Sequence, residues 1–90
     1  MDVTDRNCLK HASGLLPRGV AELGLDEDGM TAWCRHRGAG DDPVVIELDV
    51  EQPETALVND LVAEHGFRPL LALAATRRLY LEHRRRNTRH

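Results

Sequence analysis

The stretch VVIELDV at Val44–Val50 decides the fold, together with Pro53 and the later pair Gly66-Phe67. Apolar and polar residues alternate in VVIELDV, which is typical of a strand with one buried face. A proline is tolerated in the first turn of a helix, and a glycine followed by an apolar residue commonly closes one. We therefore predict a strand over 44–50 and a helix over 53–65.

Both elements should contribute apolar side chains to one core. The strand is expected to contribute Val44, Ile46, Leu48 and Val50. The helix is expected to contribute Leu57, Val58, Leu61 and Val62. These faces explain the strand–helix unit as core, so any function should come from the segments that flank it.

Upstream, the sequence predicts a hairpin of two strands, Val20–Leu25 and Met30–Arg37, joined at Asp28-Gly29. An Asp-Gly pair supplies the positive φ angles of tight hairpin turns. In the second strand, alternate residues place Cys34 on one face and Trp33 on the other, and which face is buried is left open. A short helix is predicted over Asp5–Ser13, with Thr4 as its cap and a linker up to residue 19.

The segment over residues 67–83 has two interpretations. Its Leu, Ala and Arg content favours one helix over Leu70–Arg86, with Pro69 in the first turn. Two strands, Phe67–Ala74 and Arg77–His83, are the alternative, although Ala75-Thr76 lacks a typical turn residue. We lean to the strands, on the family resemblance given below.

The 90 residues indicate one small α+β domain, 1–90, with an antiparallel or mixed sheet of about four to six strands and one main helix. No apolar run approaches the roughly 20 residues of a membrane span. The polar N-terminus lacks the features of a signal peptide, which predicts a cytoplasmic protein without a membrane partner.

Charge is strongly segregated along the chain. Residues 41–64 carry eight acids and no Lys or Arg, whereas residues 65–90 carry seven arginines and one acid. Opposite segments of this kind attract each other within one chain or between two copies, so we expect a homodimer. Residues 84–90 are predicted to form a disordered basic tail, and the net charge of −3 with few aromatic residues argues against a nucleic-acid domain.

Three segments together resemble the C-terminal half of a GCN5-related N-acetyltransferase (GNAT): the strand 44–50, the helix with its Gly66-Phe67 exit, and Arg78-Leu79-Tyr80-Leu81. The resemblance covers about 40 residues and implies a return of the chain to the sheet in a final hairpin. The family's phosphate-binding signature matches the spacing of Arg35-His36-Arg37-Gly38-Ala39-Gly40. By this resemblance Arg35, Arg37, Gly38 and Gly40 would contact acetyl-CoA or a similar phosphorylated ligand.

The same segment also resembles the CYTH fold of triphosphate-handling enzymes. The residues at matching positions are Glu47, Arg77, Arg78 and Tyr80. That fold closes an eight-stranded tunnel, which 90 residues would complete only as a dimer or as a fragment.

Cysteine and histidine also suggest a Cys2His2 zinc site. Its members would be Cys8, His11, Cys34 and His36. Cys34 and His36 would share one strand face about 7 Å apart, but the spacing matches no standard zinc module, so we predict no metal site. His65 is interpreted as a cation at a helix C-terminus.

The sequence thus leads to two functional hypotheses. The first is a shortened or degenerate GNAT-like domain that contacts an acyl-CoA, with catalytic residues unknown. The alternative is a non-enzymatic, dimeric protein-interaction module built on the acidic and basic segments.

Overall fold

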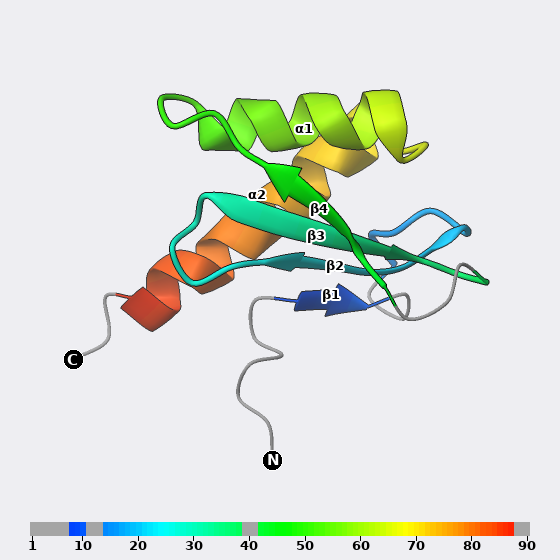
Figure 1. Cartoon of the computed structure of the whole chain (residues 1–90), viewed down its shortest axis with the longest axis horizontal. Coiled ribbons are helices and arrows are strands. Elements are labelled where there is room, and N and C mark those ends of the chain that lie inside the picture. The colour runs from blue at the N-terminus through cyan, green and yellow to red at the C-terminus, as the bar shows by residue number, and fades with distance from the viewer. Residues whose placement is uncertain (1–7, 11–13, 39–41, 88–90) are drawn as a thin grey trace, which may run out of the picture.

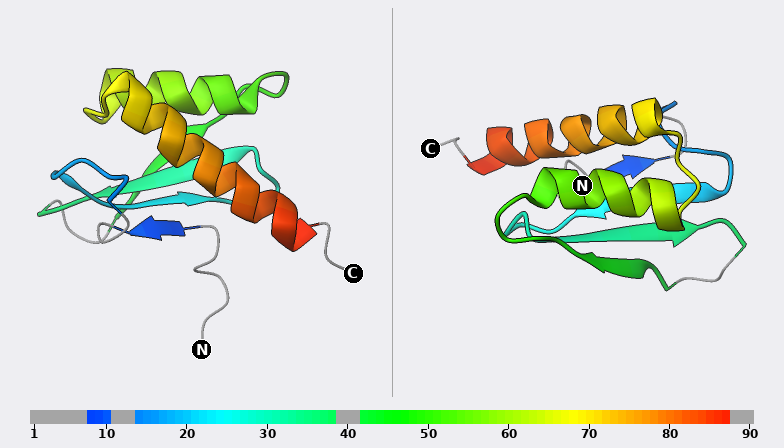
Figure 2. Two further views of the ribbon diagram at one scale, coloured as in Figure 1. Left: turned by 180° about the vertical axis from the view of Figure 1, so that it is seen from behind. Right: turned by 90° about the horizontal axis from the view of Figure 1, so that it is seen from above.

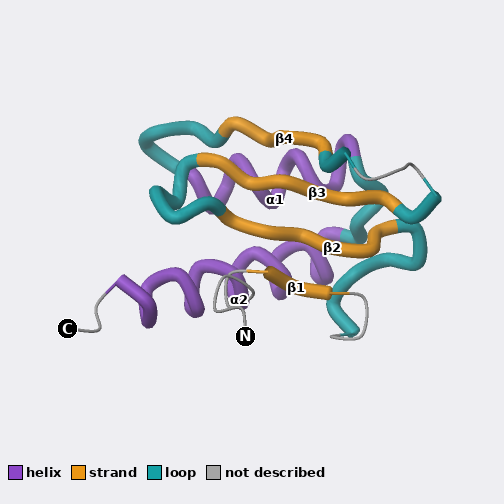
Figure 3. Tube along the Cα trace, turned by 60° about the horizontal axis from the view of Figure 1, so that its bottom comes forward, coloured by secondary structure: helices purple, strands orange, loops and turns teal. Residues whose placement is uncertain are grey.

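The computed structural model describes residues 8–10, 14–38 and 42–87, which form four strands and two helices (Figure 1). The elements are β1 Cys8–Lys10, β2 Val20–Leu25, β3 Thr31–His36, β4 Val44–Glu47, α1 Pro53–Glu64 and α2 Pro69–Asn87. The strands form one antiparallel sheet in chain order, β1-β2-β3-β4. Both helices lie on the same face of this sheet, as the tube in Figure 3 shows. The prediction of a small α+β fold is confirmed.

The predicted β2–β3 hairpin is confirmed. Gly29 adopts a φ of 74°, and the N–H of Asp26 donates to the carbonyl of Thr31 at 2.7 Å across the turn. The face left open by the sequence is settled by burial, because Ala32 and Cys34 are fully buried beneath the helices. Period-two alternation therefore places Trp33 on the opposite face of the sheet, which neither described helix covers and which we call the open face.

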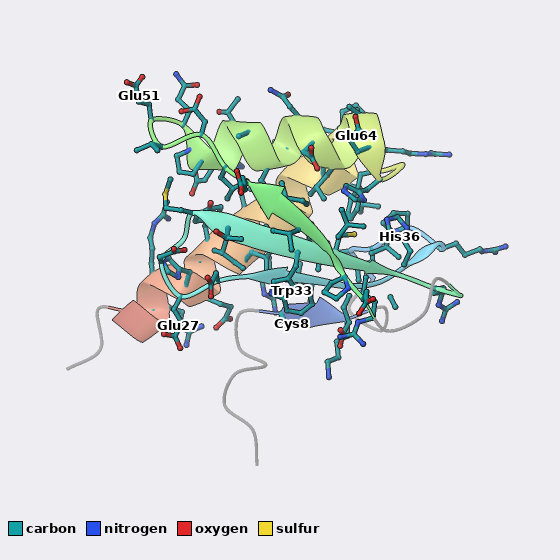
Figure 4. All side chains as sticks on the ribbon, viewed as in Figure 1. Cys8, Glu27, Trp33, His36, Glu51 and Glu64 are labelled. Carbon is teal, nitrogen blue, oxygen red and sulfur yellow. The ribbon has the colours of Figure 1, made fainter. Side chains whose placement is uncertain are left out.

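The indole of Trp33 covers Gly24, its cross-strand partner on β2. A Cβ at Gly24 would lie 2.0 Å from Cζ2 of Trp33, so only glycine leaves room for the ring. An aromatic ring placed over a strand glycine in this way restores the packing that glycine lacks. Figure 4 shows Trp33 on the open face, next to Cys8 of β1.

Helix α1 ends as predicted. Gly66 has a φ of 76°, which glycine adopts without steric cost, and the N–H of Phe67 donates to the carbonyl of Leu61 at 3.1 Å. Leu57, Leu61 and Phe67 are buried in the core. The predicted helix over 53–65 is confirmed, with His65 as its C-cap.

The strand that leads to α1 is shorter than predicted. β4 ends at Glu47, and Leu48 then bonds through its N–H to the carbonyl of Met30 at 3.0 Å. Ile46 and Leu48 are buried as expected, but Val44 is 47% and Val50 79% exposed. Alternation predicts the face of a residue, but it does not predict where the helices stop covering that face.

The preference for two strands over 67–83 is wrong, because residues 69–83 belong to the helix α2, Pro69–Asn87. The helix begins at Pro69, and its first intrahelical bond joins the N–H of Ala72 to the carbonyl of Arg68 at 2.8 Å. Residues 84–87 continue α2 instead of starting a disordered tail, and 88–90 lie outside the described residues. Helix propensity, not the family resemblance, was the correct guide here.

The N-terminal prediction is also corrected. Residues 8–10 form the edge strand β1 instead of part of a helix, and Leu9 is buried against the core. The flanking residues 5–7 and 11–13, and the predicted cap Thr4, lie outside the described residues. Pairing with β2 overrides the weak local preference for a helix in so short a segment.

Helix α2 is tied to the far end of the hairpin. The hydroxyl of buried Tyr80 donates to the carbonyl of Gly29 at 3.0 Å, 51 residues away in sequence. Alanines at Ala72 and Ala75, both fully buried, allow the helix to approach its neighbours closely. Neither described helix combines the length and the apolar composition that crossing a membrane requires.

Candidate metal centre

A cluster of metal-ligating side chains lies where β3 meets the end of α1. Cys34 and His36 are two residues apart on β3, so both point toward the helices. The Sγ of Cys34 lies 3.9 Å from Nε2 of His36. Cys34 is fully buried, whereas His36 is partly exposed at the end of the strand (Figure 4).

His65 completes the cluster from the opposite layer. Its Nδ1 lies 2.8 Å from Nε2 of His36, and the two rings stack with centroids 5.0 Å apart. His65 is 8% exposed, which is unusual for a residue at a helix end. The cap that Gly66 imposes turns the chain so that His65 stays on the core side of α1.

Asp60 orients the His65 ring. Its Oδ2 lies 3.2 Å from Nε2 of His65, so that nitrogen carries the proton and Nδ1 presents a lone pair toward the cluster. With that tautomer of His65, Nδ1 accepts and Nε2 of His36 donates in the 2.8 Å contact between the two rings. A carboxylate behind a histidine is the arrangement that fixes the tautomer of metal-ligating histidines.

The thiol of Cys34 is held protonated. Burial, assisted by the nearby charge of Asp60, raises the pKa of Cys34 from 9.0 to about 11. Reactive cysteines have a lowered pKa and partial exposure, and Cys34 has neither. A nucleophilic Cys–His pair is therefore disfavoured, whereas a metal ion would displace the proton directly.

The geometry suits a tetrahedral ion. The Cys34 Sγ, the His36 Nε2 and the His65 Nδ1 all lie within 4.8 Å of one another. In tetrahedral zinc sites the metal–ligand distances of about 2.0–2.3 Å place the ligand atoms about 3.3–3.7 Å apart. The separations of 2.8 Å between the two histidines and 3.9 Å between Cys34 and His36 lie within about 0.5 Å of that range.

The Cys2His2 set considered from sequence is not the set that the structure assembles. Cys8 pairs with Gly24, which pairs with Trp33, so Cys8 lies on the open face, opposite to Cys34. His11 lies outside the described residues. Cys34 and His36 do come together as the spacing suggested. Their third partner is His65, for which the sequence predicted only the role of a cation at a helix end.

The residues matched to a phosphate-binding signature do not form one pocket among the described residues. Nε of Arg35 lies 3.1 Å from Oε1 of Glu22 on the open face, so this arginine is already paired. Arg37 and Gly38 are exposed in the turn after β3, and Gly40 lies outside the described residues. Their assignment to acyl-CoA stays a prediction.

The CYTH-matched residues are spread over several environments. Glu47 is exposed at the end of β4, Arg77 and Arg78 are exposed on α2, and Tyr80 of the same helix is buried. They stay a resemblance without a shared site in the part of the chain that the structure describes.

One sequence signal could have identified His65. It follows Leu57 and Leu61 at intervals of four, the spacing that keeps side chains on one face of a helix. That spacing predicts a buried histidine, and a buried histidine needs a polar partner. Its partners come from β3, 29 residues earlier in the chain.

Comparison of the chain with models of protein families, with curated proteins and with solved structures gives no match. The resemblances to the GNAT and CYTH families are therefore neither supported nor opposed by relatives.

Proposed function

We propose that this protein binds a zinc-type transition-metal ion through Cys34, His36 and His65, with Asp60 as the carboxylate that orients His65. The observation that carries the proposal is the convergence of three ligand atoms from two layers within 4.8 Å. The proposal departs from our sequence prediction of no metal site.

The donor set favours a borderline or soft divalent ion. One thiolate and two imidazoles are ligands that zinc takes, and they suit calcium or magnesium poorly. Charge also balances: a dication, the Cys34 thiolate and the Asp60 carboxylate sum to zero. A neutral cluster avoids the cost of burying unpaired charge beneath α1.

Binding changes the protons in a defined way. Cys34 loses its thiol proton to solvent as the metal–sulfur bond forms. His36 gives up its Nε2 proton and carries one on Nδ1, while His65 already presents the Nδ1 lone pair. The direct His36–His65 hydrogen bond is thus replaced by two bonds to one ion.

The expected role is structural. An ion held by β3 and by the last turn of α1 joins the sheet to the helix layer, and the full burial of Cys34 limits access of a substrate. Three protein ligands leave one tetrahedral position for water, a ligand count found in catalytic zinc sites, so the structural role depends on the burial of Cys34. Free energy of metal binding then adds to the free energy of folding.

The test is metal titration of the reduced, chelator-treated protein. Co²⁺ should produce a thiolate charge-transfer band and tetrahedral d–d bands, and Zn²⁺ should displace it. At free zinc about 100 times the Kd, stability should rise by about 2.7 kcal/mol, which for a chain of this size raises Tm by about 10 °C or more.

Variants separate the centre from nonspecific binding. Cys34→Ser and His65→Gln should abolish the charge-transfer band, whereas Cys8→Ser, a matched cysteine on the open face, should keep it. The same melting assay with acetyl-CoA tests the acyl-CoA hypothesis. A Tm rise with acetyl-CoA and none with zinc, or a cobalt band that survives Cys34→Ser, would overturn the metal proposal.

A further inference from the structure

The outer side of α2 carries an exposed apolar stripe. Leu70 is 82% and Leu81 50% exposed, and Ala74 between them is exposed as well. Intervals of four and seven residues keep these three side chains on one face of a helix. Figure 2 shows α2 lying over the sheet with this outer side uncovered by the other described elements.

Arginines flank the stripe on both sides. Arg77, Arg78, Arg84 and Arg85 are all exposed. Arg84 pairs with Glu54 of α1 and Arg85 with Glu82, whereas Arg77 and Arg78 form no ion pair within the part of the chain that the structure describes. The outer face of α2 is therefore an amphipathic, strongly basic surface with an apolar centre.

The same chain carries a surface of the opposite charge. The loop between β4 and α1 presents Val50, 79% exposed, between the exposed acids Asp49 and Glu51. Oδ1 of Asp49 accepts the backbone N–H of Glu51 at 2.8 Å, which holds the loop in shape around Val50. Figure 4 shows Glu51 at the tip of this loop.

The two surfaces adjoin each other on one copy. Glu51 and Arg84 line a common hollow of about 440 Å³ together with Tyr80. The acidic loop borders the basic helix. A two-fold axis near this border therefore places the loop of each copy on the helix of the other, so one symmetry operation creates both contacts. A two-fold contact of this kind uses both surfaces of both copies and closes on itself.

We infer that the outer face of α2 is a docking surface for the β4–α1 loop of a second copy of this chain. Val50 of each copy packs against the Leu81 end of the stripe, and the acids of the loop face Arg77 and Arg78. Removing Leu81 and Val50 from water supplies affinity, and the charges supply orientation and association rate. The inference is independent of the metal centre.

The experiment uses two charge-reversed full-length variants. Arg77→Glu/Arg78→Glu makes both surfaces acidic. Asp49→Asn/Glu51→Arg makes both basic, and the amide oxygen at position 49 still accepts the backbone N–H of residue 51. By sedimentation at low ionic strength, the wild type should have twice the mass of the monomer, and each variant alone should be monomeric. An equimolar mixture of the two should recover the doubled mass, because its surfaces are again complementary.

A matched control reverses two exposed arginines elsewhere. Arg18→Glu/Arg37→Glu changes the net charge as much as the α2 variant and should retain the doubled mass. High salt should raise the dissociation constant of the wild type at least tenfold. Three results would overturn the inference. The first is a monomeric wild type at low salt, and the second is a mixture that stays monomeric although circular dichroism shows both variants to be folded. The third is binding of the wild type to anionic vesicles or RNA in competition with self-association.

Discussion

The covered and open faces of the sheet are built from alternate residues of one strand, β3, and they hold different chemistry. On the covered face Cys34 and His36 meet His65 in a buried polar cluster. On the open face Trp33 lies on Gly24, and Arg35 pairs with Glu22. Burial makes each lost contact costly on the first face, while solvent replaces lost contacts on the second.

The largest expected effect is on the covered side. Leu61→Ala removes a fully buried side chain between α1 and the sheet and should lower the free energy of unfolding by about 2–5 kcal/mol. Val45→Ala, at a 62% exposed position of β4, should change it by less than about 0.5 kcal/mol. Urea denaturation measures the free energy of unfolding of both variants. Equal losses would contradict the difference between the covered and open faces.

The next effect belongs to the tightly packed contact between Gly24 and Trp33 on the open face. Gly24→Ala places a Cβ inside the Trp33 ring position and should cost about 1–3 kcal/mol, because the indole must move off the sheet. In a Trp33→Ala background the same change should cost little. A double-mutant cycle on unfolding free energies tests this, and strict additivity would contradict it.

Alkaline pH should weaken the covered side. Burial raises the pKa of Cys34 from 9.0 to about 11 and that of Tyr80 from 10.0 to about 12, so the folded protein keeps protons that the unfolded chain loses. This stability is full below the unfolded pKa values and is lost as pH rises from them through the folded values, by an amount on the order of a few kcal/mol. Denaturation of metal-free protein from about pH 8 to 11 measures it.

A control separates the two groups in that pH series. Cys34→Ala should remove the part of the loss that begins near pH 9, and the later part due to Tyr80 should persist. A pH dependence identical to that of the wild type would show that Cys34 titrates normally in the folded protein.

The smallest effect is expected for the charges of the open face. Glu22 lies 3.1 Å from Arg35 and 3.9 Å from Lys10, and all three side chains reach solvent. Glu22→Gln should cost about 0.2–1 kcal/mol at low salt and less at high salt. Thermal melts at two salt concentrations check this. A loss of stability that does not depend on salt would indicate that these three charges are more buried than their exposure suggests.

Elements with strong local signals were predictable. The Asp28-Gly29 turn, the alternation of β3 and the Gly66 cap each depend on a few neighbouring residues, and all three are present in the structure. The helix α2 was predictable from its Leu, Ala and Arg content, and it was missed because a resemblance was preferred to propensity. β1 was missed because a three-residue strand exists only through its pairing with β2.

By itself, the sequence determined the hairpin, the strand–helix unit and the segregation of charge, because each is set within one turn, one period or one run of residues. Only the tertiary structure decided which face of β3 is covered and which residue completes the cluster of Cys34 and His36. His65 reaches them from 29 residues away because α1 packs across the sheet in one particular register. Packing of this kind depends on the whole core at once, and no local pattern in the chain encodes it.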